Sequence, residues 1–193
     1  CPAGKYLETT GNDELDDCVA CAAGKYSEVD GSPSGTTCLN CTAGTYSNTT
    51  GNDAVGDCQP CAKGTYSTVA GAAARSTCQP CGVGKYLDTT GNDAEEDCVA
   101  CSAGKYSDVS GSSSGTTCLN CGVGKYLDTT GNDAEEDCMA CGEGKYSLDT
   151  GSPSGTTCLN CPAGKYLETT GNDELDDCMA CGEGTYSDVD GSP

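Results

Sequence analysis

The sequence contains no tryptophan, phenylalanine, histidine or isoleucine among its 193 residues. Leucine and valine together supply only 19 residues. That is about half of the one-fifth share below which a chain usually lacks the side chains for a packed core. These absences exclude an ordinary globular domain, although a chain of this length could otherwise bury one.

Catalytic groups are missing as well. Without histidine no Ser-His-Asp triad can form. The many carboxylates lie on turns, where they lack the burial that tunes the pKa of a general acid or base. We therefore expect no enzymatic activity and no cofactor, apart from the calcium considered below.

Positive charge is scarce. The chain has nine Lys and Arg residues but 30 Asp and Glu residues, so its net charge is −21. Such a surface repels phosphate backbones and anionic lipid, which argues against nucleic-acid and membrane-surface partners. The longest uncharged apolar runs, such as residues 19–24, are far too short to span a bilayer. We expect no membrane span in this segment.

Cysteine and glycine are abundant instead, with 19 and 28 residues. They recur with a strict period of 20 residues: cysteine at positions 1 and 18 of each unit, glycine at 4 and 11, and tyrosine at 6. A fixed period of this length indicates a repeat array in which each unit contacts mainly its neighbours. We read residues 1–193 as one continuous array, with units 1–20, 21–40, 41–60, 61–80, 81–100, 101–120, 121–140, 141–160, 161–180 and a partial unit 181–193.

Each unit has the pattern of a short hairpin. Segments such as residues 5–10 (KYLETT) favour an extended strand, and the following TTGND favours a turn. No helical periodicity is present. The expected fold is therefore small and disulfide-rich: a linear array of ten irregular β-hairpin repeats of 20 residues, with no helix and no globular core. A lone hairpin is marginal in water, so each needs a crosslink and its neighbours.

The cysteines allow two disulfide patterns that keep the repeat symmetry. Pairing inside each C-x-x-C would leave Cys1 alone, whereas pairing within each unit leaves Cys181 unpaired. A C-x-x-C disulfide is typically labile and redox-active, which favours the second pattern. Each loop of about 17 residues would then contribute about 3 kcal/mol. The bonds of this pattern are Cys1–Cys18, Cys21–Cys38, Cys41–Cys58, Cys61–Cys78, Cys81–Cys98, Cys101–Cys118, Cys121–Cys138, Cys141–Cys158 and Cys161–Cys178.

Zinc is the competing interpretation. The spacing C-x2-C-x16-C-x2-C falls within the range of four-cysteine zinc sites. The absence of histidine and the uniform repetition count against it, but the spacing alone leaves it open.

The tyrosine at position 6 also has two interpretations. Its ring can cover the local disulfide and the adjoining unit, with the hydroxyl near water. Alternatively, the tyrosines form an exposed ladder for ligand stacking or crosslinking. We expect the packing role for Tyr6, Tyr26, Tyr46, Tyr66, Tyr86, Tyr106, Tyr126, Tyr146, Tyr166 and Tyr186.

The motif Cys-x-x-Gly-[Lys/Thr]-Tyr-[Ser/Leu], followed by Cys-x-x-Cys, resembles the ephrin-receptor-like cysteine-rich repeat. It is similar to the small single-disulfide module of tumour-necrosis-factor-receptor cysteine-rich domains. The resemblance implies an extracellular rod in which the first cysteine of each unit is bonded to the second, as at Cys1 and Cys18. Such repeats occur in receptor ectodomains and in surface proteins of single-celled eukaryotes and algae.

A second period of 40 residues concerns charge: 22 of the 30 acidic residues lie in odd-numbered units. In the first unit, Asn12, Asp13, Glu14, Asp16 and Asp17 supply oxygen ligands of the kind calcium prefers, but without EF-hand spacing. We treat Asp13, Glu14, Asp16 and Asp17 as weak calcium candidates. The usual role of such loops is solubility.

Two N-x-[ST] sequons, at Asn48 and Asn40, are candidate glycan sites in a secreted chain. Asn40 directly precedes a cysteine and is the weaker of the two.

We expect a segment of a secreted structural protein, located outside the cell or on its surface, that self-associates into a filament, surface coat or cell-surface hair, or binds other extracellular proteins. The alternative is a receptor-like ectodomain or spacer that binds a protein ligand. Near-identical units favour the structural role, because a polymer needs a repeated surface.

Overall fold

The computed structural model describes residues 1–11 and 14–193. They divide into two compact units: unit 1 comprises residues 1–81, 87–99 and 111–114, and unit 2 comprises residues 82–86, 100–110 and 115–193. Both units consist of the same 20-residue repeat.

Each of the nine complete repeats contains two strands of two residues. The first strands are β1 (Lys5–Tyr6), β3 (Lys25–Tyr26), β5 (Thr45–Tyr46), β7 (Thr65–Tyr66), β9 (Lys85–Tyr86), β11 (Lys105–Tyr106), β13 (Lys125–Tyr126), β15 (Lys145–Tyr146) and β17 (Lys165–Tyr166). The second strands are β2 (Val19–Ala20), β4 (Leu39–Asn40), β6 (Gln59–Pro60), β8 (Gln79–Pro80), β10 (Val99–Ala100), β12 (Leu119–Asn120), β14 (Met139–Ala140), β16 (Leu159–Asn160) and β18 (Met179–Ala180).

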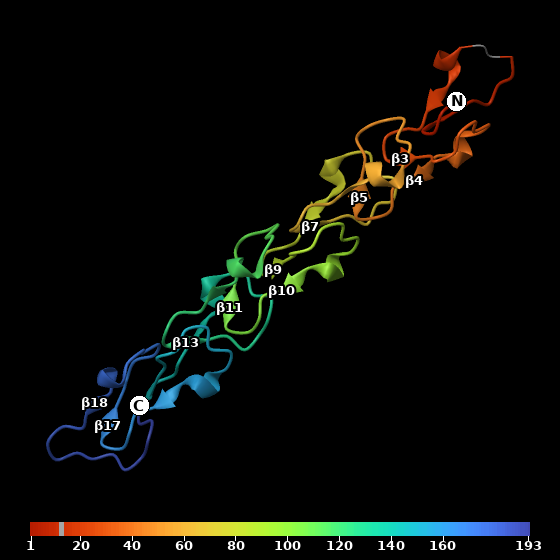
Figure 1. The fold of residues 1–193 in the computed structure, drawn as a ribbon. Coiled ribbons are helices and arrows are strands. Elements are labelled where there is room, and N and C mark those ends of the chain that lie inside the picture. Colours follow the sequence, from red (N-terminus) through yellow and green to blue (C-terminus); the bar gives the residue numbers. More distant parts are fainter. Residues whose placement is uncertain (12–13) are drawn as a thin grey trace. The chain divides into compact units, whose positions relative to one another are not determined.

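The strands of a repeat pair antiparallel. In β3 and β4, which lie side by side in Figure 1, Lys25 is opposite Asn40 and Tyr26 is opposite Leu39. The same register recurs in unit 2, where Tyr126 is opposite Met139. The small disulfide-rich fold of hairpin repeats is thus confirmed. Over the described residues there are nine hairpins rather than the expected ten, because residues 181–193 form no strand.

A short 3-10 helix precedes the second cysteine of each complete repeat, a feature that the sequence did not predict. These helices are η1 (Leu15–Asp17), η2 (Gly35–Thr37), η3 (Val55–Asp57), η4 (Arg75–Thr77), η5 (Glu95–Asp97), η6 (Gly115–Thr117), η7 (Glu135–Asp137), η8 (Gly155–Thr157) and η9 (Leu175–Asp177). Each spans only three residues, so it leaves no 3.6-residue periodicity in the sequence. The expectation of no helix was therefore right about long helices and wrong about these turns.

Three backbone hydrogen bonds join successive repeats. In unit 1, Gly24 N–H donates to the Ser47 carbonyl at 2.8 Å and Ser27 N–H to that of Asn52 at 3.1 Å. In the return direction Gly51 N–H donates to the Cys21 carbonyl at 2.8 Å. Because these are backbone bonds, the junction depends little on side-chain identity. This explains how the loop sequences can vary while the spacing stays constant.

The same junction occurs in unit 2. Gly124 N–H donates to Ser147 at 2.8 Å, Leu127 N–H to Ser152 at 2.9 Å, and Gly151 N–H to Cys121 at 2.8 Å. A parallel bridge between Tyr126 and Ser152 accompanies these bonds. Each hairpin, which would be marginal alone, is therefore extended by the loop of the following repeat.

A repeat also contacts the repeat two positions further along the chain. The sequence predicted contact mainly between adjacent repeats and did not include this one. A Cβ atom on Gly4 would lie 2.3 Å from the carbonyl oxygen of Gly51, two repeats away. The reason is the length of the arm between positions 4 and 11, which at about 3.3 Å per residue reaches past one repeat. Consecutive repeats therefore overlap within a unit.

Candidate functional site

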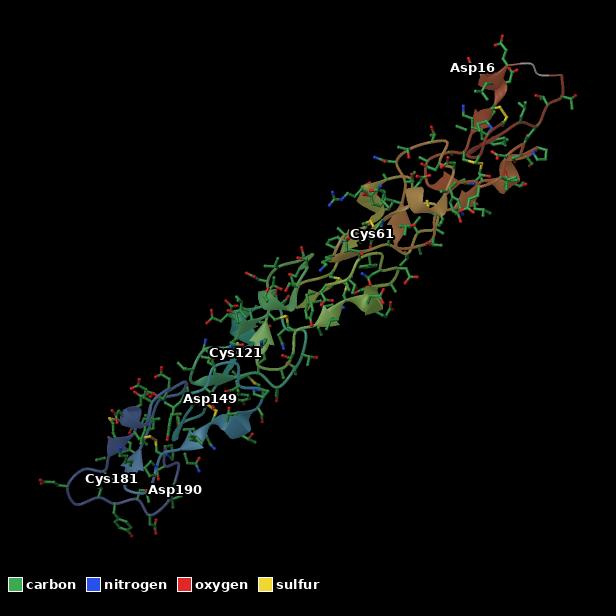
Figure 2. The ribbon with its side chains drawn as sticks, in the orientation of Figure 1. Asp16, Cys61, Cys121, Asp149, Cys181 and Asp190 are labelled. Carbon is green, nitrogen blue, oxygen red and sulfur yellow. A yellow bond between two sulfur atoms is a disulfide. The ribbon has the colours of Figure 1, made fainter. Side chains whose placement is uncertain are left out.

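The repeat junction combines the backbone hydrogen bonds between repeats with the disulfides, which form its centre. Eighteen of the nineteen cysteines form nine bonds, each spanning 17 residues with Cα atoms 5.6–5.8 Å apart. The first cysteine is fully buried in most repeats, as Cys61 and Cys121 are. Figure 2 shows these two residues inside the fold.

The bonds join the first and second cysteines of each complete repeat, Cys1 with Cys18 through Cys161 with Cys178. Cys181 is free and partly buried. The zinc alternative required thiolates at the C-x-x-C pairs, and bonded cysteines cannot supply them. In residues 1–11 and 14–193 no three His, Cys, Asp or Glu side chains are grouped so that they could hold a metal ion.

Tyrosine at position 6 packs against the disulfide of the following repeat. In unit 1, Tyr66 contacts the buried cluster of Cys81, Leu87 and Cys98. In unit 2, Tyr106 contacts Cys121, Leu127 and Cys138 in the same way. The sequence interpretation named the local disulfide and the adjoining unit. In these clusters the ring covers the disulfide of the adjoining repeat. The tyrosine therefore packs one repeat against the next.

Burial of the tyrosines bears on the ladder interpretation. Tyr146 is 8% exposed and lies in a cluster with Cys161, Leu167 and Cys178. Tyr186 is 86% exposed, and the other tyrosines are partly buried. A partly buried ring offers little free face for stacking a ligand, so the packing role fits this arrangement better.

The tyrosine ring also explains a glycine that three of the even-numbered repeats share, Gly35, Gly115 and Gly155. A Cβ atom on Gly35 would lie 3.0 Å from Cζ of Tyr6, and one on Gly155 would lie 3.1 Å from Cζ of Tyr126. Odd-numbered repeats carry larger residues at the same position, such as Val55. The 40-residue period is therefore partly a packing period, in which an odd repeat's tyrosine lies against an even repeat's glycine, except in the fourth repeat, which carries Arg75 at this position.

Position 7 is the main feature that sequence reasoning missed. Its side chain is buried in eight of the ten repeats, whether it is serine, as at Ser107, or leucine, as at Leu127, and half-buried at Leu7 and Ser187. The available signal was the restriction of this position to serine and leucine in all ten units. Its backbone takes part in the junction as both donor and acceptor, because Leu127 N–H binds Ser152 and its carbonyl accepts Gly104 N–H at 2.7 Å.

The acidic loops have a structural role at position 17. The Asp57 carboxylate accepts the N–H groups of Asp53 and Ala54, each at 3.1 Å, and so closes the turn before η3. Asp177 does the same for Asp173 and Glu174. This is a capping arrangement that leaves fewer carboxylate lone pairs for a cation.

The structure describes three of the four calcium candidates in the first repeat. Asp17 accepts the N–H of Glu14 at 3.4 Å, and Asp16 lies exposed at the surface (Figure 2). Asp13, with its neighbour Asn12, lies outside the described residues. Glu14, Asp16 and Asp17 are not brought together as a set of metal ligands.

The two sequons differ in their surroundings. Asn48 is exposed and follows β5 in a loop. Asn40 is also exposed, but it lies in β4 with its side chain against the backbone of a later repeat: a Cβ atom on Gly71 would lie 3.0 Å from its Oδ1. An attached glycan has more freedom at Asn48.

The family described as tyrosine-protein kinase ephrin type A/B receptor-like matches residues 49–98 and 89–138. Residues 49–138 are similar to this family, and the tandem array of disulfide-bonded, cysteine-rich repeats is consistent with it. The matched module is a non-catalytic structural repeat, despite the kinase in the family's description. The same register of Cys, Gly and Tyr continues on both sides of the matched residues. No curated protein matches the chain.

The ephrin-receptor-like repeats and the nine disulfides together indicate an extracellular location, because such bonds persist in oxidising compartments. Within the described part of the chain every helix is a three-residue turn, so none approaches the length that crossing a bilayer requires.

Proposed function

We propose that this array is an extracellular structural protein, a stiff element that self-associates into a filament, surface coat or cell-surface hair. One observation carries the proposal: the same backbone junction is repeated from one repeat to the next within each unit. A repeated surface suits a polymer, whereas a specific receptor site needs a unique one. Length is then set by copy number, as in other repeat proteins.

Electron microscopy of native material tests this role. Self-association predicts long, uniform fibres or a regular coat that binds antibody raised against residues 1–193. The control is the same material after thiol reduction, which removes the disulfides. Isolated short particles in untreated material, with no fibre or coat, would exclude the filament proposal.

A receptor-like binding module is the second candidate, and the fourth repeat, residues 61–80, favours it. This repeat contains no acidic residue, and it exposes Lys63 and Arg75 in a chain of net charge −21. Such a local change of charge suits an acidic protein partner. Retention of extracellular proteins on the immobilised chain, lost when Lys63 and Arg75 are both replaced by alanine, would support it. As a control, Lys5 and Lys25 are replaced instead.

Glycans and calcium are secondary parts of the proposal. Glycosylation at Asn48 predicts a mass shift that an endoglycosidase removes and that Asn48→Gln abolishes, with Asn40→Gln as the comparison. Calcium binding by the acidic loops predicts a higher melting temperature at millimolar calcium than at equal magnesium. An unchanged melting temperature would leave solubility as the role of these loops.

A further inference from the structure

The disulfides define a short covalent path along the array. In the seventh repeat the bond joins Cys121 directly to Cys138, with their Cα atoms 5.8 Å apart. Only Met139 and Ala140 separate Cys138 from Cys141, where the next bond begins. The residues between Cys121 and Cys138 therefore form a closed side loop. A pull on the chain ends passes from bond to bond without entering that loop.

We propose that the array is a load-bearing tether in which tension bypasses the loops. Its use in the living system depends on the structural role proposed above, but the load path itself follows from the covalent connections of a single chain. Strand β13 and the 3-10 helix η7 lie inside this loop, whereas strand β14 (Met139–Ala140) is the segment between the bonds and lies on the path itself. The loops are then available for surface chemistry while the cysteines and the two residues between them carry the force.

The path sets a limit on extension. Three residue steps reach at most about 11 Å, and the disulfide contributes 5.6–5.8 Å between Cα atoms. The oxidised chain can therefore extend to about 16 Å per repeat, even if every inter-repeat hydrogen bond breaks. With its disulfide reduced, the same 20 residues can extend to about 70 Å. Oxidation thus restricts the reach of each repeat about fourfold.

The positions of the basic residues are consistent with this separation of roles. All nine lysine and arginine residues lie inside disulfide loops and none lies in the two-residue segments between them: Lys5, Lys25, Lys63, Arg75, Lys85, Lys105, Lys125, Lys145 and Lys165. Cleavage after a basic residue would open loops but leave the covalent path whole. The tether is therefore expected to survive trypsin-like proteases under tension.

Single-molecule stretching of residues 1–193 between handles on the two ends tests the limit on extension. Without reductant, the chain is expected to stop at about 16 Å per repeat. Dithiothreitol then gives each cystine two electrons and two protons, which yields two thiols and the cyclic disulfide of the reagent. Each reduction is expected to release about 50 Å, in at most nine steps. Extension well beyond the limit without reductant would overturn the proposal.

Nicked chains test the load path itself. The wild-type chain is cleaved with trypsin and stretched without reductant, and it is expected to hold the load until dithiothreitol is added. The matched control is Met139→Lys, which places a cleavage site between Cys138 and Cys141. This variant is expected to part under load after cleavage, with no reductant present. Parting of the nicked wild-type chain without reductant would overturn the proposal.

The structural role and the load path can be refuted independently of each other. Stretching is carried out on one chain, so it gives the expected steps even if electron microscopy finds no fibres. Conversely, fibres could form while the nicked chain parts, which would leave the structural role intact and exclude the bypass of the loops. The steps of the unmodified chain need no variant, so the result does not depend on correct folding of Met139→Lys.

Discussion

Gly124 and Gly171, two repeats apart, lie so close that a Cβ atom on Gly124 would be 2.2 Å from the carbonyl oxygen of Gly171. Both have positive φ, +71° and +76°. The near approach brings backbone against backbone, so a side chain there has nowhere to move. This pair fixes how a repeat lies against its second neighbour within unit 2.

Gly124→Ala is therefore expected to destabilise the fold by at least about 2 kcal/mol, from the left-handed backbone and the blocked approach together. The matched control is Gly122→Ala in the same loop, because nothing lies within 4 Å of a Cβ atom there. The control should change stability by less than about 0.5 kcal/mol. Urea unfolding under non-reducing conditions measures both, and equal midpoints would show that the glycine contact contributes little.

Tyr106 is expected to contribute more to stability than its partial exposure suggests, because its ring covers the disulfide of the next repeat. Tyr106→Ala should cost about 2–4 kcal/mol, whereas Tyr106→Phe should cost under about 1 kcal/mol. Tyr186→Ala is the control, since that ring is 86% exposed. Thermal unfolding of the three variants provides the measurement. A Tyr106→Ala midpoint equal to that of the control would argue against the packing role.

Asp137 is expected to act as a cap rather than as a surface charge. Its carboxylate accepts the N–H of Ala134 at 3.2 Å, and Asp137→Ala should lose about 1 kcal/mol. Glu136→Ala removes the same charge from an exposed neighbour and should change stability by less than half as much. Hydrogen exchange at Ala134 distinguishes the two, because only Asp137→Ala should speed it. Similar exchange in both variants would remove the capping role.

The disulfide-rich hairpin fold was predictable because it depends on spacing alone. Cys121, Tyr126 and Cys138 recur in every complete repeat at the same positions, so one physical interpretation applied nine times. Loop variation carried little structural information, since the inter-repeat bonds use the backbone.

Other features could not be read from one repeat. Leu127 packs against the disulfide of its own repeat and with Tyr106 of the preceding one, and a sequence pattern of two-residue strands does not show which side faces a neighbour. The tyrosine interpretation placed the ring on the local disulfide and the adjoining unit, whereas Tyr66 and Tyr106 lie against the disulfide of the adjoining repeat. The 3-10 turn at Glu135–Asp137 is too short to have a period. These features depend on how far each repeat overlaps the next.

The pairing of cysteines within each repeat is the central claim, and trypsin tests it directly. Every basic residue lies inside a disulfide loop, so after complete digestion under non-reducing, denaturing conditions the fragments should remain one covalent chain. Only residues 64–75, which contain no cysteine, should be released, because Lys63 and Arg75 share one loop. Reduction should then yield the separate peptides. Free fragments such as 106–125 and 126–145 without reduction would mean C-x-x-C bonds or free thiols, and would contradict the account.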